Sequence, residues 1–93
     1  MTVFVPTPLR SYTNNRAEVH AAGSTVGDIL YDLDRQFPGM RFRMIDEQNN
    51  IRQHIRFFVK GEAALLPTQL HPGDDLQIIC AISGGRAGIR GTL

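Results

Sequence analysis

The period of the apolar residues changes along the chain, and these changes separate strand-like segments from a helix-like one. Residues 2–5 are mostly β-branched or aromatic, and Pro6 and Pro8 end this run. After a turn signal at Asn14-Asn15, apolar residues alternate with polar ones over residues 16–22. The pattern predicts two strands that pair as an antiparallel hairpin with a long loop.

The next segment has the spacing of an amphipathic helix. Ser24 or Thr25 can cap it, and Thr25 with Asp28 has the spacing of a weak capping box. Pro38-Gly39 ends the pattern. One apolar stripe runs along the segment and consists of Val26, Ile29, Leu30, Leu33 and Phe37. We expect this stripe to cover one face of a sheet.

The second half of the chain returns to strand-like patterns. The expected elements are a short turn or helix over residues 40–45, a polar loop over 46–50, a strand over 55–60, an extended piece at 65–67 and a strand over 76–82. Because the last strand is apolar almost throughout, we expect it in the middle of the sheet. The order predicts an α+β fold: a mixed sheet of four to five strands, one main helix on one face, and parallel first and last strands.

Composition narrows the class of protein. The 93 residues support one core and leave little room for a buried enzyme pocket, so we expect no intrinsic enzyme activity. The formal net charge is only +1, which argues against nonspecific attraction to nucleic acid or membrane. The sequence has no apolar run typical of a signal peptide or membrane span, and its single cysteine fits a reducing compartment. These features favour a cytoplasmic protein.

Strand parity divides the expected sheet into two faces. One face is consistently apolar and is expected to lie under the helix: Val3, Val5, Ile55, Phe57, Val59, Leu76 and Ile78. Phe4, Phe58 and Ile79 fall on the opposite face with the polar side chains of the same strands. If their strands are neighbours, these three form an exposed apolar patch suited to docking a partner. The alternatives are isolated exposed residues or a face covered by another copy.

Other reactive side chains carry weaker signals. His20, His54 and His71 lack the spacing of a zinc site, so we expect no metal. Cys80 is in phase with the inward-facing residues of the last strand and is expected to be buried. A modest basic patch at Arg35, Arg41 and Arg43 is most simply a set of solvated charges at helix ends.

A glycine pair, Gly84-Gly85, follows the last expected strand, and eight residues follow the pair. The strand order ending in this pair resembles the ubiquitin-like β-grasp sulfur carriers of the MoaD/ThiS type, and looks closest to those of cysteine biosynthesis. The resemblance covers residues 1–85. The matching motifs are Pro6-Thr7-Pro8-Leu9-Arg10, Gly23-Ser24-Thr25-Val26-Gly27, Arg56-Phe57-Phe58-Val59-Lys60-Gly61-Glu62, Pro72-Gly73-Asp74-Asp75-Leu76 and Ala81-Ile82-Ser83-Gly84-Gly85.

The resemblance implies a chemistry for the tail Ser83-Gly84-Gly85. An E1-like adenylating enzyme joins the carboxylate of Gly85 to AMP using ATP, and a sulfur donor then displaces AMP to leave a thiocarboxylate. The carrier itself binds no cofactor. Glycine suits such a tail because it has no side chain to obstruct entry into another enzyme's active site.

The eight residues after Gly85 depart from the simplest form of the family. A carboxylate must be free before it is adenylated, so the Gly85–Arg86 bond has to be cut first. The resemblance implies a JAMM-type metalloprotease for this step. We therefore expect a carrier domain over residues 1–85 and a removable flexible extension over 86–93.

The sequence leaves three functions open. The first is a sulfur carrier that supplies a biosynthetic acceptor enzyme, such as a cysteine-synthase-like one, in a pathway making cysteine, a cofactor or a secondary metabolite. The second is a ubiquitin-like protein modifier joined to lysines through Gly85. The third is a β-grasp interaction module whose tail is never cut.

Overall fold

The central strand of the sheet is the last one, as the sequence predicts. The structure is a computed structural model that describes residues 1–81. Its strands are β1 (Thr2–Phe4), β2 (Glu18–His20), β3 (Ile55–Val59), β4 (Glu62–Ala64) and β5 (Leu76–Cys80). They form one sheet in the order β2-β1-β5-β3-β4. β1 pairs with β5 in parallel, and the other neighbours are antiparallel. The mixed five-stranded sheet is therefore confirmed.

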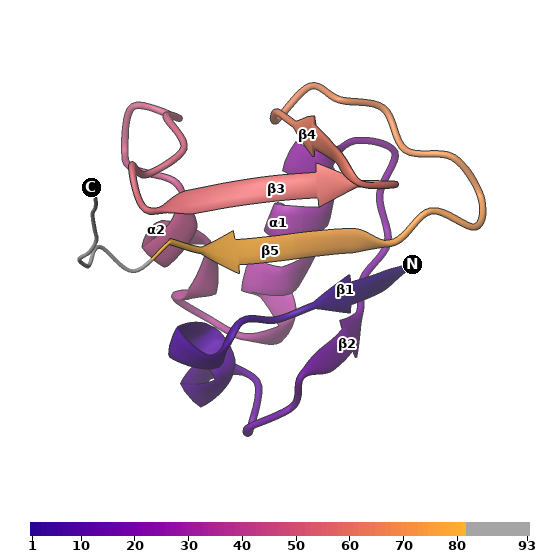
Figure 1. The fold of residues 1–93 in the computed structure, drawn as a ribbon. Helices are drawn as coiled ribbons and strands as arrows, with labels where there is room; N and C mark the ends of the chain where they lie inside the picture. The colour runs from indigo at the N-terminus through magenta and orange to yellow at the C-terminus, as the bar shows by residue number, and fades with distance from the viewer. Residues whose placement is uncertain (82–93) are drawn as a thin grey trace, which may run out of the picture.

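The main helix, α1 (Val26–Gln36), crosses one face of the sheet (Figure 1). It begins with a complete capping box: the Thr25 side chain accepts from the Asp28 backbone N–H, and the Asp28 carboxylate accepts from the Thr25 backbone N–H. A left-handed Gly39, with φ of 92°, follows its end and leads into the short helix α2 (Met40–Met44). The helix limits and the cap agree with the sequence pattern.

The core lies between α1 and the inner face of the sheet. Its strand residues are the predicted ones, with Val59 only partly buried at the margin. The largest fully buried side chains include Phe57, Ile29, Leu30, Leu33, Met40, Met44, Ile45, Ile55, Leu76 and Ile78. The sheet and α1 are thus held together by burial of apolar area on one side of each.

The fourth strand is not where the sequence pattern placed an extended piece. It lies at Glu62–Ala64 instead of 65–67, and Leu65 is exposed. Lys60 and Gly61 both have positive φ, 54° and 78°, so they make a two-residue turn and Val59 pairs with Glu62. Turns with two positive φ values match the twist of a hairpin, and this geometry starts β4 immediately after β3.

The loop of the first hairpin contains an element that the pattern did not predict. Residues Thr7–Tyr12 form a 3-10 helix, η1, with Pro8 in its first turn and Leu9 buried. The hairpin itself is confirmed, but β2 is shorter than the predicted 16–22. Figure 1 shows η1 on the same side of the molecule as the last residues of β5, the strand that leads to the C-terminus.

Candidate functional site

The tail leaves the sheet at the end of its central strand. Ala81 is the last residue that the structure describes, and its backbone N–H donates to the carbonyl oxygen of His54 over 2.7 Å. This bond holds the root of the tail beside the start of β3. The residues predicted to carry the chemistry and the cleavage, Ser83, Gly84, Gly85 and Arg86, lie outside the described residues.

The predicted outer-face residues lie on adjacent strands. Phe4 in β1 and Phe58 in β3 both pair with Gln77 of β5, so Gln77 lies between the two rings. Ile79 is two residues further along β5 and pairs with Arg56. Phe4 is 37% exposed, and Phe58 and Ile79 are half-buried. We call Phe4, Phe58 and Ile79 the outer patch.

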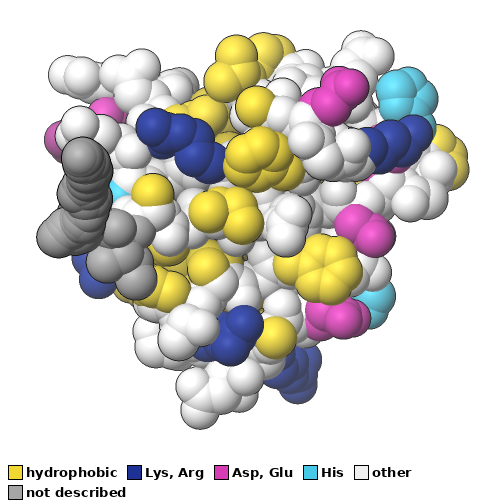
Figure 2. All heavy atoms as spheres, viewed as in Figure 1, with side chains coloured by type: hydrophobic (Ala, Val, Ile, Leu, Met, Phe, Trp, Pro, Cys, Tyr) yellow, Lys and Arg dark blue, Asp and Glu magenta, His cyan; other side chains and the backbone are white. Residues whose placement is uncertain are grey.

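The three residues of the outer patch therefore lie on one face of the sheet, but they do not form a continuous apolar surface, because the polar Gln77 lies between the two rings. Figure 2 shows separate hydrophobic side chains over β1, β5 and β3, with Lys or Arg between some of them. A shallow hollow of about 210 Å³ lies beside Gln77 and is lined by Phe4, Phe58, Lys60, Gly61, Asp75 and Gln77. Such a surface offers apolar contact and hydrogen bonding to a partner together.

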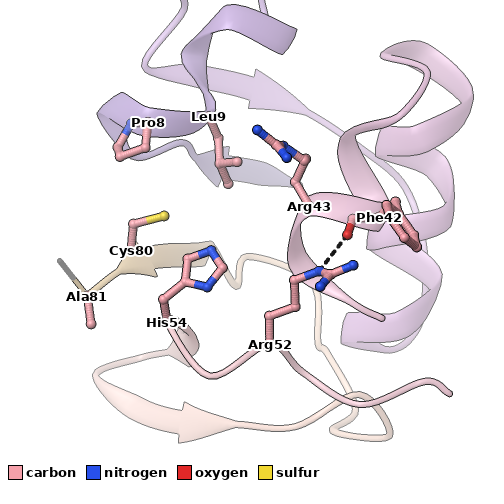
Figure 3. A pocket seen from close by; sticks show the side chains of 8 residues that line it. All are labelled: Pro8, Leu9, Phe42, Arg43, Arg52, His54, Cys80 and Ala81. Atoms are coloured by element: carbon pink, nitrogen blue, oxygen red, sulfur yellow. Dashed lines mark hydrogen bonds between the residues drawn. The ribbon is translucent and has the colours of Figure 1, made fainter. Parts of the chain in front are cut away.

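A second, larger hollow lies at the root of the tail. It has a volume of about 530 Å³ and is lined by Pro8, Leu9, Phe42, Arg43, Arg52, His54, Cys80 and Ala81. We call it the tail-root pocket. In Figure 3 the side chains of His54 and Cys80 point into the space beneath Pro8 and Leu9, and the guanidinium of Arg43 lies beside Leu9. Four separate parts of the chain thus meet at this pocket: η1, α2, the loop before β3 and the end of β5.

Sequence patterns missed the tail-root pocket because its residues come from distant segments. The three arginines considered above as a basic patch do not act as one unit: Arg35 pairs with Asp32 at 2.7 Å, and Arg41 packs over the Tyr31 ring at 4.3 Å. Only Arg43 of that set lines the pocket. Arg52 joins it from the loop before β3, and no sequence pattern connected the two arginines.

Cys80 differs from its prediction. It is half-buried rather than buried, because it is the last residue of β5 and borders the tail-root pocket. Burial raises the pKa of the Cys80 thiol. The thiol is therefore protonated at neutral pH, which makes it a weak nucleophile.

The opposite end of β5 is held by an internal charge cluster. The Asp74 carboxylate is buried, lies 3.2 Å from Lys60 Nζ and accepts from the His71 backbone N–H over 2.8 Å. The hydrogen bond from His71, and next the Lys60 ammonium, lower the pKa of Asp74. Asp74 thus closes the turn before β5 through bonds made within the domain.

Within residues 1–81, no three His, Cys, Asp or Glu side chains lie close enough together to hold a metal ion. No helix of this part has the length and apolarity needed to cross a membrane.

Comparison with known proteins supports the resemblance found in the sequence. A family model described as the ThiS family matches residues 3–85. The sulfur carrier protein CysO of Mycobacterium tuberculosis is 31% identical over 91 residues, which cover 91% of this chain and 98% of that protein. Small archaeal modifier protein 1 of Haloferax volcanii is 34% identical over 62 residues, covering 67% of this chain and 71% of that protein.

A solved structure shows the same fold. The crystal structure of the Amycolatopsis orientalis BexX/CysO complex contains a chain that matches with a TM-score of 0.83 and 32% identity. The match covers 90% of this chain and 98% of that chain. The α+β fold with a mixed sheet and one main helix is therefore the β-grasp arrangement of these proteins.

Proposed function

Because the chain belongs to the ThiS family, we propose that it is a sulfur carrier whose working group is the carboxylate of Gly85. The Gly85 carboxylate attacks the α-phosphorus of ATP on an adenylating enzyme and displaces pyrophosphate. Sulfide delivered by a sulfur donor then attacks the acyl carbon, and AMP leaves with the bonding electron pair. The product is a thiocarboxylate at Gly85 that passes its sulfur to a biosynthetic acceptor enzyme.

The observation that carries this proposal is the match of the ThiS family over residues 3–85, which ends at the second glycine. The described fold agrees with it. β5 is the central strand and the hydrogen bond from Ala81 to His54 anchors its end, so the tail starts from a rigid base. A rigid base and side-chain-free glycines allow a partner enzyme to position Gly85 while the domain stays outside.

The eight residues after Gly85 make processing part of the proposal. In the full chain, Gly85 is joined to Arg86 and has no free carboxylate. Cleavage of that bond, for which we propose a JAMM-type metalloprotease, releases residues 86–93. Every described helix and strand lies within residues 1–81, so this cleavage removes none of them.

We propose the outer patch as the surface that docks the adenylating enzyme. Phe4, Phe58 and Ile79 lie on the one face of the sheet that α1 does not cover. Apolar side chains on such a face lose their contact with water when a partner binds, which favours association.

The test is mass spectrometry of the protein isolated from its own host. We expect a form that ends at Gly85, part of which has one oxygen replaced by sulfur. In a reconstituted reaction, residues 1–85 should release pyrophosphate from ATP with the host's adenylating enzyme, and the full chain should not. The proposal is contradicted if the active host contains no form other than the full-length chain. It is also contradicted if the full chain and residues 1–85 release pyrophosphate at equal rates.

A second function is favoured by one specific relative. Small archaeal modifier protein 1 of Haloferax volcanii is 34% identical over 62 residues. If this chain is also a modifier, the same Gly85 adenylate ends in an isopeptide bond to a lysine. A ladder of larger covalent adducts in host extract would favour the modifier, and a labile thiocarboxylate without adducts would favour the carrier.

The third hypothesis, that the protein is an interaction module, makes a different prediction. If the tail is never cut or activated, a chain truncated after residue 83 retains its function in the host. Loss of function in that truncated chain excludes the interaction module.

A further inference from the structure

The tail-root pocket carries positive charge that the described part of the chain does not neutralise. Within residues 1–81 the ion pairs are Arg35–Asp32, Lys60–Asp74 and His71–Asp74. Neither Arg43 nor Arg52 pairs with a carboxylate of this part of the chain, and none of the residues lining the pocket is acidic. The pocket is thus a cationic surface whose charge is available to another molecule.

One of these arginines is held in a fixed position. Arg52 Nε donates to the carbonyl oxygen of Phe42 over 2.7 Å, and its guanidinium carbon lies 4.6 Å from the centre of the Phe42 ring. Figure 3 shows this bond at the edge of the pocket. The terminal nitrogens of Arg52 have no hydrogen-bond partner among residues 1–81. A guanidinium fixed through Nε presents these two groups in a geometry suited to a carboxylate.

The pocket also has an exposed apolar edge. Phe42 is 54% exposed although it lies on a helix that packs against the core, and Pro8 is exposed on the other side. Arginine and aromatic side chains are the types enriched where protein interfaces bind most strongly. The pocket therefore fits a protein surface that combines a carboxylate with apolar side chains.

The length of the tail brings any enzyme acting on Gly85 close to this pocket. Gly85 is four residues beyond Ala81, which corresponds to a reach of about 14 Å when fully extended. When Gly85 is next to ATP inside an active site, the rim of that site therefore lies within about 14 Å of the tail's root, which the pocket borders.

Processing makes these two arginines more important for the later steps. Removal of Arg86 and Arg90 changes the formal net charge from +1 to −1 and takes the positive charges off the tail. The enzyme that cuts the tail meets those charges, but the adenylating enzyme does not. After cleavage, Arg43 and Arg52 remain as the two arginines that line the pocket at the root of the tail.

We propose that the tail-root pocket docks an acidic rim of the adenylating enzyme, with Arg43 and Arg52 binding carboxylates and Phe42 contacting apolar side chains around them. This inference rests on the proposed function of Gly85. It adds a second contact surface, of defined charge, to the outer patch. The contact positions the processed carrier and takes no part in the chemical step.

The test is steady-state pyrophosphate release by residues 1–85 with the host's adenylating enzyme at saturating ATP. We expect the double variant R43Q/R52Q to raise KM about tenfold with kcat unchanged, because two ion pairs at a rim contribute to binding and not to chemistry. R43E alone should raise KM more than R43Q. Raising the salt concentration should increase KM for the unmodified carrier and have little effect on the double variant.

Arg16→Gln is the matched control. Arg16 is exposed and makes no side-chain hydrogen bond or ion pair with residues 1–81, and R16Q loses one positive charge, as R43Q does. Its KM should equal that of the unmodified carrier. Thermal melting of each variant establishes that its fold is retained, and R43Q is the safest variant because Arg43 makes no side-chain hydrogen bond within residues 1–81.

Several results would overturn the proposal. One is a KM for R43Q/R52Q equal to that of Arg16→Gln, and another is a loss confined to kcat. A defect seen only in removal of the tail by the protease would assign the pocket to that enzyme instead. If the unmodified residues 1–85 release no pyrophosphate, the proposed function of Gly85 is wrong. If they release it and the variants do so with the same KM, only the docking role of the tail-root pocket is wrong.

Discussion

Phe57 and Phe58 are neighbours in β3, and the two phenylalanines have different environments. Phe57 is 1% exposed and packs in the core beneath α1, whereas Phe58 is half-buried on the outer face beside Gln77. The alternation of side chains along a strand places the two rings on opposite faces of the sheet, and α1 covers only the inner face. The comparison teaches that residue type does not distinguish a structural phenylalanine from one available for docking.

The same division extends along β5. Leu76 and Ile78 are buried, and Gln77 and Ile79 face outward between the neighbours of β5. The inner face is complete within the domain, because α1 covers it. The outer face has no covering element among the described residues (Figure 2), so its apolar side chains remain available to a partner.

The largest effect is expected on the inner face. Phe57→Ala should lower the free energy of unfolding by about 3–5 kcal/mol, because it removes apolar contacts and leaves a cavity in the core. That loss is a large part of the stability of a domain of this size, about 5–15 kcal/mol. Urea unfolding followed by circular dichroism measures it. A loss below about 1 kcal/mol would contradict the assignment of Phe57 to the core.

The next largest effect is expected from a substitution on the outer face, which should change activity rather than stability. Phe58→Lys should abolish adenylation of residues 1–85, while changing the free energy of unfolding by about 1 kcal/mol or less. Pyrophosphate release and urea unfolding measure the two quantities. Phe58→Ile is the control, since it keeps an apolar side chain that favours a strand at the same position. Unchanged turnover by Phe58→Lys would contradict the proposal that the outer patch docks the adenylating enzyme.

The smallest effect is expected from two carboxylates outside the two faces of the sheet, and it concerns the dependence of the melting temperature on pH. The pKa values of Asp74 and Asp32 are lowered from 3.8, chiefly by backbone hydrogen bonds from His71 and Ala22. Their contribution to stability is fully present above about pH 4 and is lost as the pH falls through the lowered values. The melting temperature should therefore change little between pH 7 and 5 and decrease below pH 4.

The variant Asp74→Asn isolates this contribution. It should be less stable than the unmodified chain at pH 7, because Lys60 loses its partner, and its melting temperature should decrease less below pH 4. Identical pH profiles for the two chains would show that the Asp74 cluster does not contribute to acid unfolding.

Several elements were predictable because their signals are local. The helix follows from five apolar residues at helical spacing and from a cap at Thr25, and the two faces of the sheet follow from alternation in β3 and β5. The position of β4 was missed because it depends on Lys60, a non-glycine residue with positive φ. Sequence patterns rarely indicate a left-handed conformation at a lysine.

The sequence by itself determined the order of the elements, the apolar face of each strand and the glycine pair that ends the family match at residue 85. Each of these is a property of neighbouring residues, because periodicity and turn chemistry act over a few positions. Only the tertiary structure decided that Gln77 lies between Phe4 and Phe58, and that Arg43 and Arg52 line one pocket with Cys80. These placements depend on strand register and on packing between distant segments, which the pattern of a single segment does not encode.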